Sequence, residues 1–360
     1  MTTHSSRLRR YILKTASCLA FTLATGFGVS TATADETYRL KLHTYVPLGV
    51  PPMQHLILPW AEELNKKSDG RLKIDVYPMM QLGGRQPQLI EQVKDGVVDM
   101  VWTILGATPG RFVRSEVFEL PFVHRNTTAT NLALREMLSN ELAADFPDFK
   151  TLMLHVHAGN ALHMRDTPLE TLEDFKNKKI RSPGQTSTEF LSAVDMSPIA
   201  TTLTDISSMM SRGVLDGAML PFDVLPAIKL YDMVDYHVMM DQDRRPTTAI
   251  FMLAINPKSY EKLPEDLRAL IDTSMTEEMA VKAAEVFDRF DQLGIDLVSK
   301  GDGQIITLSP KETERVIKAS EPVVERWRQR IKDSGGDADK LLQRSHDLSE
   351  KYTKKGSDNS

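Results

Sequence analysis

Two segments of this chain, 117 residues apart, follow the same pattern of apolar residues, glycine and aspartate. In Leu89–Asp99, apolar residues at helical spacing are followed by a glycine, two apolar residues and an aspartate, and Ile206–Asp216 repeats that order. The glycines, 96 and 213, suit a left-handed helix C-cap, and the apolar run after each aspartate is typical of a buried strand. Copies this far apart do not form a solenoid. The pattern predicts the same helix-to-strand unit in two similar lobes; a chance likeness of two α/β segments is the alternative.

Apolar periodicity elsewhere in the chain also predicts an α/β fold. Residues 38–43 alternate apolar and polar as a strand, residues 53–64 carry a helical apolar stripe, and residues 72–76 alternate again. This β-α-β order with short connections predicts a parallel sheet covered by helices. From Pro264 to about Lys300 one apolar stripe continues, which predicts a single long helix that could run along both lobes. A strand at 305–308 and two amphipathic helices follow.

The first 34 residues read as a secretory signal peptide. A basic segment with three arginines and a lysine precedes an apolar stretch from Ala16 to about Val29, and Ala32-Thr33-Ala34 is typical of a cleavage site. The run from Arg9 to Lys14 also resembles a twin-arginine signal, so both export routes stay open. No later segment approaches the roughly 18 apolar residues of a membrane-spanning helix.

Charge and cysteine content exclude several classes of partner and chemistry. The full chain has a net charge of −5, and cleavage after Ala34 removes four positive charges and no acidic residue. An acidic protein disfavours nucleic acid or anionic lipid as the main partner. The one cysteine, Cys18, lies in the expected signal peptide, so the mature chain is predicted to have no disulfide and no thiolate metal ligand.

Catalytic and cofactor motifs are missing from the sequence. It contains no nucleophile elbow, phosphate-binding glycine loop, dinucleotide fingerprint or zincin helix, so we expect no enzyme activity and no cofactor. The nearest metal candidate is His155-Val156-His157 with His163. Three histidines can hold a catalytic zinc ion, which leaves an exported metal-dependent hydrolase as the alternative function. We expect no metal site, because no carboxylate stands at a suggestive spacing.

Arg181 lies in a basic run, Lys176–Gly184, in which a short strand is expected to end at Pro183-Gly184. An arginine at the end of a strand can project into a cleft, and its planar fork can hold a carboxylate in two parallel hydrogen bonds. From the residues alone, a solvated surface arginine is the more common situation.

Several motifs, taken in order, resemble the solute-binding proteins of TRAP (tripartite ATP-independent periplasmic) transporters, of the C4-dicarboxylate-binding (DctP) type. The resemblance covers residues 37 to about 330 and rests on the order and spacing of these segments: Tyr77-Pro78, Gln81-Leu82-Gly83, Asp95–Asp99, Phe118–Phe122, Leu172–Lys176, Lys179–Gly184, Gly213–Gly217 with Pro221, and Tyr260–Pro264. It implies an α/β fold of two lobes with a ligand cleft between them and a long helix that spans both. Arg181 matches the carboxylate-binding arginine of the family.

The departures from the family pattern concern the ligand. Members that bind polyhydroxylated acids tend to have an asparagine where this chain has Leu220, and residues 249–252 are wholly apolar here. We therefore expect an apolar pocket with one anion clamp, suited to an aromatic or poorly hydroxylated monocarboxylate. A sugar acid would leave its hydroxyls unpaired. The expected binding residues are Arg181, with Arg165 as a second cation, and a set of apolar walls: Tyr45, Trp102, Leu220, Phe222 and Phe251.

The expected organisation follows from the resemblance. Residues 1–34 form the signal peptide, 35–157 with 250–285 one lobe, 158–249 with 286–350 the other, and 351–360 a polar tail. The protein is expected in the periplasm, where it captures a small organic carboxylate and delivers it to the membrane permease subunits of the transporter. A ligand-sensing protein with a receptor as partner is the remaining alternative.

Overall fold

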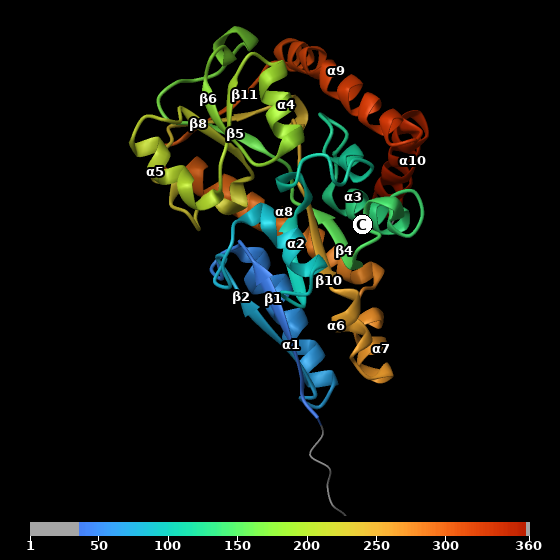
Figure 1. The fold of residues 1–360 in the computed structure, drawn as a ribbon. Coiled ribbons are helices and arrows are strands. Elements are labelled where there is room, and N and C mark those ends of the chain that lie inside the picture. Colours follow the sequence, from blue (N-terminus) through green and yellow to red (C-terminus); the bar gives the residue numbers. More distant parts are fainter. Residues whose placement is uncertain (1–35, 358–360) are drawn as a thin grey trace, which may run out of the picture. The chain divides into compact units, whose positions relative to one another are not determined.

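The computed structural model describes residues 36–357, so the expected signal peptide lies outside the described residues. Two β-sheets organise this part of the chain (Figure 1). The first has the strand order β2-β1-β3-β10-β4, with bounds β1 (Tyr38–Thr44), β2 (Leu72–Tyr77), β3 (Met100–Ile104), β4 (Lys150–Val156) and β10 (Ile250–Ile255). The expected parallel pairing of the first two strands is confirmed, and β10 joins β3 and β4 in antiparallel fashion.

The second sheet has the strand order β11-β9-β5-β8-β6-β7. Its strands are β5 (Ala161–Met164), β6 (Lys179–Ser182), β7 (Ser197–Ala200), β8 (Gly217–Leu220), β9 (Tyr236–Met239) and β11 (Gln304–Thr307). Strand β6 pairs in parallel with β7 and β8, whereas β5 is antiparallel to both of its neighbours. The chain therefore forms the two α/β lobes that the repeated segments predicted.

The central strands of both sheets, such as β3, β10 and β8, are buried on both faces. In the first, Trp102 and Leu253 belong to one apolar cluster while their neighbours Val101 and Met252 belong to another. Successive side chains of a strand point to opposite faces, so these central strands need apolar residues at nearly every position. This explains the uninterrupted apolar runs in the sequence. The second sheet separates two further clusters in the same way.

Ten α-helices cover these sheets within the described residues. Their bounds are α1 (Leu58–Lys67), α2 (Leu89–Lys94), α3 (Thr127–Leu138), α4 (Gln185–Ala193), α5 (Ile206–Ser211), α6 (Pro257–Glu261), α7 (Glu265–Thr273), α8 (Glu277–Lys300), α9 (Pro310–Asp333) and α10 (Ala338–Ser357). None of the helices in residues 36–357 is both long and apolar enough to cross a membrane. Helix α10 packs on α3 and continues through Lys351, so most of the expected polar tail is helical (Figure 1).

The repeated segments occupy equivalent places in the two sheets. The first forms α2 followed by β3, and the second forms α5 followed by β8. Gly96 has a φ of 73° and Gly213 a φ of 71°, the left-handed conformation expected of a C-cap glycine. The prediction of one helix-to-strand unit in each lobe is confirmed.

The prediction of a single long helix over residues 264–300 is wrong at one point, because the helix is interrupted between α7 and α8. The Thr276 side chain accepts a hydrogen bond from Met279 N and so caps a new helix, and Ser274 Oγ accepts one from Trp60 Nε1. Short hydroxyl side chains compete with the helical hydrogen-bond pattern in this way. The remaining helix α8 packs into the first-sheet core through Phe287 and into the second-sheet core through Val298, so it spans both lobes.

Candidate functional site

Arg181 is a buried cation without an acidic partner among the described residues. It lies in the middle of β6 and is 5% exposed. Its Nε donates to Thr201 O and its Nη1 to Met219 O, both at 3.2 Å, and it forms no ion pair in residues 36–357. Burial lowers the pKa of Arg181 to about 10, so the guanidinium remains charged at neutral pH. A buried charge is costly unless it is paired, which makes this position a strong candidate for an anionic ligand.

Arg181 lines a cavity of about 70 Å³ to which both sheets contribute. Five of the seven residues expected in the site meet there: Tyr45, Trp102, Arg181, Leu220 and Phe251. Tyr45 directly follows β1, and Leu220 is the last residue of β8. The carboxyl ends of parallel strands are where open α/β sheets usually bind ligands. The other lining residues are Val46, Val50, Pro52, Ile104, His157, Asn160, Pro183, Leu203, Pro221, Asp223, Val224, Ala249 and Phe287.

Stacked rings form one wall of the cavity. The rings of Trp102 and Phe251 lie 5.1 Å apart at an interplanar angle of 25°, and Phe287 packs on Phe251 at 5.7 Å. Trp102 Nε1 donates to His155 Nε2 at 3.0 Å, which fixes the indole in place. A rigid, flat, apolar wall beside one guanidinium fits a planar ring that carries a carboxylate.

Two of the expected site residues do not line this cavity. The Arg165 side chain is 35% exposed, forms an ion pair with Asp166 at 2.6 Å and donates to Met210 O. Phe222 is fully buried against His163, with ring centroids 4.8 Å apart. Its backbone N–H donates to Asp291 on α8, and its ring packs against His163 and His237 on the side away from the cavity. The neighbouring residues Pro221 and Asp223 do line the cavity.

Three polar residues that line the cavity were not expected there from the sequence, although His157 was considered as a metal ligand. Asn160 lies where the chain crosses from the first sheet to the second, and its backbone N–H donates to Thr247 O, in the returning segment, at 2.7 Å. Asp223 is 3% exposed, and burial raises its pKa well above the ordinary range. His157 accepts from Ala249 N. Only tertiary structure brings these residues together. The one sequence signal that could have pointed to Asp223 is its position two residues after Pro221, just beyond the second repeated segment.

The three histidines of the metal hypothesis are occupied in other ways. His155 accepts from Trp102, His157 ring nitrogens face two backbone N–H groups, and His163 pairs with His237 at 2.7 Å and with Leu220 O. Burial lowers the pKa of each of them. Within residues 36–357 no group of three or more histidine, cysteine, aspartate or glutamate side chains is arranged to hold a metal ion.

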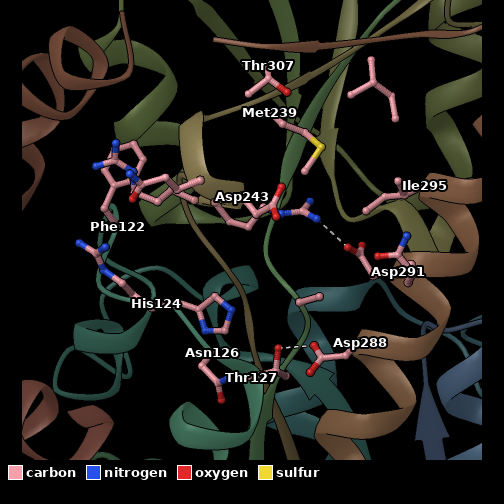
Figure 2. A pocket seen from close by; sticks show the side chains of 17 residues that line it. Phe122, His124, Asn126, Thr127, Met239, Asp243, Asp288, Asp291, Ile295 and Thr307 are labelled. Carbon is pink, nitrogen blue, oxygen red and sulfur yellow. Dashed lines mark hydrogen bonds and ion pairs between the residues drawn. The ribbon is translucent and has the colours of Figure 1, made fainter. Parts of the chain in front are cut away.

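A second, larger recess of about 630 Å³ lies elsewhere (Figure 2). Its carboxylates include Asp291, which pairs with Arg245 at 2.8 Å, and Asp288, which accepts a hydrogen bond from Thr127. Asp243 adds a third carboxylate. Arg125, Arg244 and Arg245 line the recess as well. Arg244 and Arg245 are paired with Glu314 and Asp291, and Arg125 is exposed, so the described residues of this recess offer no buried unpaired cation like Arg181. The cavity at Arg181 is therefore the candidate ligand site.

Comparison with known proteins identifies the class of this fold. Residues 44–330 match the family model described as bacterial extracellular solute-binding protein, family 7. A TRAP solute-binding protein from Rhodoferax ferrireducens T118, solved with copurified benzoate, is 34% identical, covers 89% of this chain and 100% of its own, and has a TM-score of 0.85.

Two further relatives differ in what they bind. A marine metagenome TRAP solute-binding protein specific for aromatic acids, solved with 3-hydroxybenzoate, is 32% identical with a TM-score of 0.84, covering 88% of this chain and 99% of its own. The sialic acid-binding periplasmic protein SiaP of Vibrio cholerae is 22% identical over 256 residues, which is 66% of this chain and 75% of that protein.

Proposed function

This chain belongs to bacterial extracellular solute-binding protein family 7, and from that premise we propose that it captures an aromatic monocarboxylate for a TRAP transporter. One observation carries the choice of ligand: Arg181 is a buried guanidinium without an acidic partner among the described residues, in a cavity whose other walls are mostly apolar. Two solved structures above 30% identity contain benzoate and 3-hydroxybenzoate.

The proposed mechanism is capture without chemistry. The ligand carboxylate pairs with Arg181 from the second lobe, while Trp102 and Phe251 of the first lobe cover its ring. A ligand that contacts both lobes binds the closed arrangement better than an open one, so binding shifts the population toward closure. Tyr45 and Leu220 complete the walls. Arg165 has no part in this site, because it is paired on the surface.

The division into lobes and the cellular setting are part of the proposal. All strands of the first sheet fall within 35–157 and 250–285, and those of the second within 158–249 and 286–350. Helix α10 packs on α3 and joins the first lobe. The family supports delivery to TRAP permease subunits, and the sequence of residues 1–34 supports export to the periplasm through a cleaved signal peptide.

Mass spectrometry and calorimetry test this function. Protein purified from its native host without refolding is denatured, and the released small molecules are identified. We expect an aromatic monocarboxylate. After removal of bound ligand, titration with benzoate and 3-hydroxybenzoate is expected to show tight binding, and D-glucuronate, a hydroxyl-rich acid of similar charge, is expected not to bind. Tight binding of glucuronate alone would contradict the proposal.

A further inference from the structure

Asp223 is the only acidic residue that lines the Arg181 cavity in the part of the chain that the structure describes. It is 3% exposed, and its Oδ1 has no hydrogen-bond partner among the described residues. Neither Arg181 nor Arg245 forms an ion pair with it. A buried polar atom is nearly always hydrogen-bonded, so an unpartnered one at the wall of a ligand cavity points to the ligand.

The backbone, and not the side chain of Asp223, holds this residue in place. The short helix Phe222–Val224 lies against α8, where Phe222 N donates to Asp291 Oδ1 at 2.7 Å. Gly294 of α8 permits this contact, because a Cβ there would lie 2.3 Å from Phe222 O. Asp291 is in turn paired with Arg245 at 2.8 Å. Asp223 is therefore presented to the cavity by a segment whose anchoring does not use its carboxyl group.

The charge balance of the cavity decides what this carboxyl can contact. The ligand carboxylate pairs with the guanidinium of Arg181. A second ionised carboxylate in this buried cavity would repel the ligand carboxylate, because little solvent screens the two charges. Burial raises the pKa of Asp223 well above its usual range, which favours the neutral acid. A neutral carboxyl group both donates and accepts hydrogen bonds, and this matches a hydroxyl group.

We propose that Asp223 hydrogen-bonds a hydroxyl group on the ligand ring, so that this site prefers a hydroxylated aromatic carboxylate over an unsubstituted one. The inference rests on the proposed function and adds a specificity-determining residue to it. A buried polar group that hydrogen-bonds a ligand hydroxyl lowers the affinity for an analogue that lacks the hydroxyl, because the group is then left unpaired.

Size-matched ligands test this preference by calorimetry. The probes are 3-hydroxybenzoate, 4-hydroxybenzoate and the two methylbenzoates with a methyl group at the same positions. For at least one position the wild-type protein is expected to bind the hydroxyl compound about tenfold more tightly than the methyl compound, a difference of about 1.4 kcal/mol. Asp223→Leu is expected to bring the two within roughly threefold, whereas Asp223→Asn, which keeps an acceptor and a donor, retains the preference.

Leu203→Ala provides the matched control, since Leu203 also lines the cavity and carries no polar group. It is expected to weaken both members of a pair alike and leave their ratio unchanged. Thermal melts without ligand verify that each variant is folded. Equal loss for the hydroxyl and methyl compounds in Asp223→Leu would place Asp223 at the ligand carboxylate and overturn the inference, as would a wild-type ratio near one at both positions.

Arg181→Ala separates failure of this inference from failure of the proposed function. If the benzoates bind wild type, lose affinity in Arg181→Ala and show no hydroxyl preference, only the inference about Asp223 fails. If none of them binds wild type, the proposed function fails and the inference with it.

Discussion

Gly106 and Gly184 touch across the two lobes. Gly106 lies in the turn after β3, and Gly184 directly precedes α4. A Cβ on Gly184 would lie 3.1 Å from the carbonyl oxygen of Gly106. Beside this contact, Gly110 N donates to Gln185 Oε1 at 2.9 Å. The segments that leave β3 and β6 thus meet directly, next to the strands that carry Trp102 and Arg181.

Gly184→Ala is expected to weaken ligand binding. Gly184 has a φ of −169°, an extended conformation that alanine adopts without strain, so the added methyl acts only through the contact with Gly106. Overpacking of this kind costs about 1–3 kcal/mol, which corresponds to a loss of roughly fivefold or more in affinity. The added methyl group destabilises only the arrangement in which the two lobes are closed on each other. The melting temperature of the ligand-free protein should therefore stay close to that of wild type.

Gly301→Ala is the control for this substitution, since its nearest contact would be an ordinary 3.5 Å. Calorimetric titration of wild type and both variants with 3-hydroxybenzoate gives the comparison. Wild-type affinity in Gly184→Ala would show that the contact does not belong to the ligand-bound arrangement.

Arg181→Ala is expected to abolish tight binding of any aromatic carboxylate. Truncating one partner of a buried charge pair costs about 2–5 kcal/mol, or roughly 30- to 4,000-fold in affinity. Arg181→Lys should fall between wild type and alanine, because lysine keeps the charge but not the planar fork. Isothermal titration with benzoate measures the three proteins, and thermal melts check that they remain folded.

Arg165→Ala serves as the matched control, because its guanidinium lies on the surface and is paired with Asp166. Its affinity for benzoate should equal that of wild type. An Arg181→Ala protein that binds as well as Arg165→Ala would remove Arg181 from the site.

The repeated segments show which part of the fold was readable from the sequence. Beyond the confirmed helix, glycine cap and strand, their aspartates make the same contact: Asp99 accepts from Lys41 N in β1, and Asp216 accepts from Lys179 N in β6, both at 2.8 Å. Each carboxylate ties the start of its own strand to the neighbouring parallel strand. The local pattern predicted the helix, the glycine cap and the strand because these are contiguous in the chain, whereas the aspartate contacts join segments 58 and 37 residues apart.

What the sequence left open depends on contacts between distant segments. Whether Phe222 or Asp223 faced the cavity followed from the docking of their helix on Asp291, 69 residues further along. Asn160 enters the site because its crossing segment pairs with Thr247 in the returning one. The break at Ser274 was misread, since the apolar stripe continues across it while the hydroxyl caps interrupt the backbone hydrogen bonds.

Removal of metal ions is expected to leave binding unchanged. The ring nitrogens of His155, His157 and His163 already hydrogen-bond to Trp102, to backbone groups or to another histidine. Chelating a metal would break these buried hydrogen bonds. Dialysis against EDTA, followed by titration with 3-hydroxybenzoate and elemental analysis, makes the measurement. A drop in affinity that added zinc restores would bring back the hydrolase alternative.

The protonation of Glu119 is expected to make stability depend on pH. Glu119 is 3% exposed, and its Oε1 accepts from Ile250 N at 2.8 Å. Burial is the main cause that raises the pKa of Glu119 to about 8 from an ordinary value of 4.5. Between these two values the folded protein holds a proton that the unfolded chain has released. The free energy of unfolding therefore falls as pH rises through this window, by up to about 1.4 kcal/mol per pH unit.

Glu119→Gln isolates this contribution, because the amide keeps an oxygen for Ile250 N and does not titrate. Below pH 6.5, buried histidines with lowered pKa values act in the opposite direction, since the unfolded chain then binds their protons: His124, His155, His157, His163 and His237. The informative quantity is thus the difference in melting temperature between wild type and variant. We expect the melting temperature of Glu119→Gln to rise steadily relative to that of wild type from about pH 5 to pH 8. For the control Glu321→Gln, at an exposed position on α9, the difference in melting temperature from wild type is expected to stay constant. A pH-independent difference for Glu119→Gln would mean that this carboxyl is already ionised in the folded protein at pH 5.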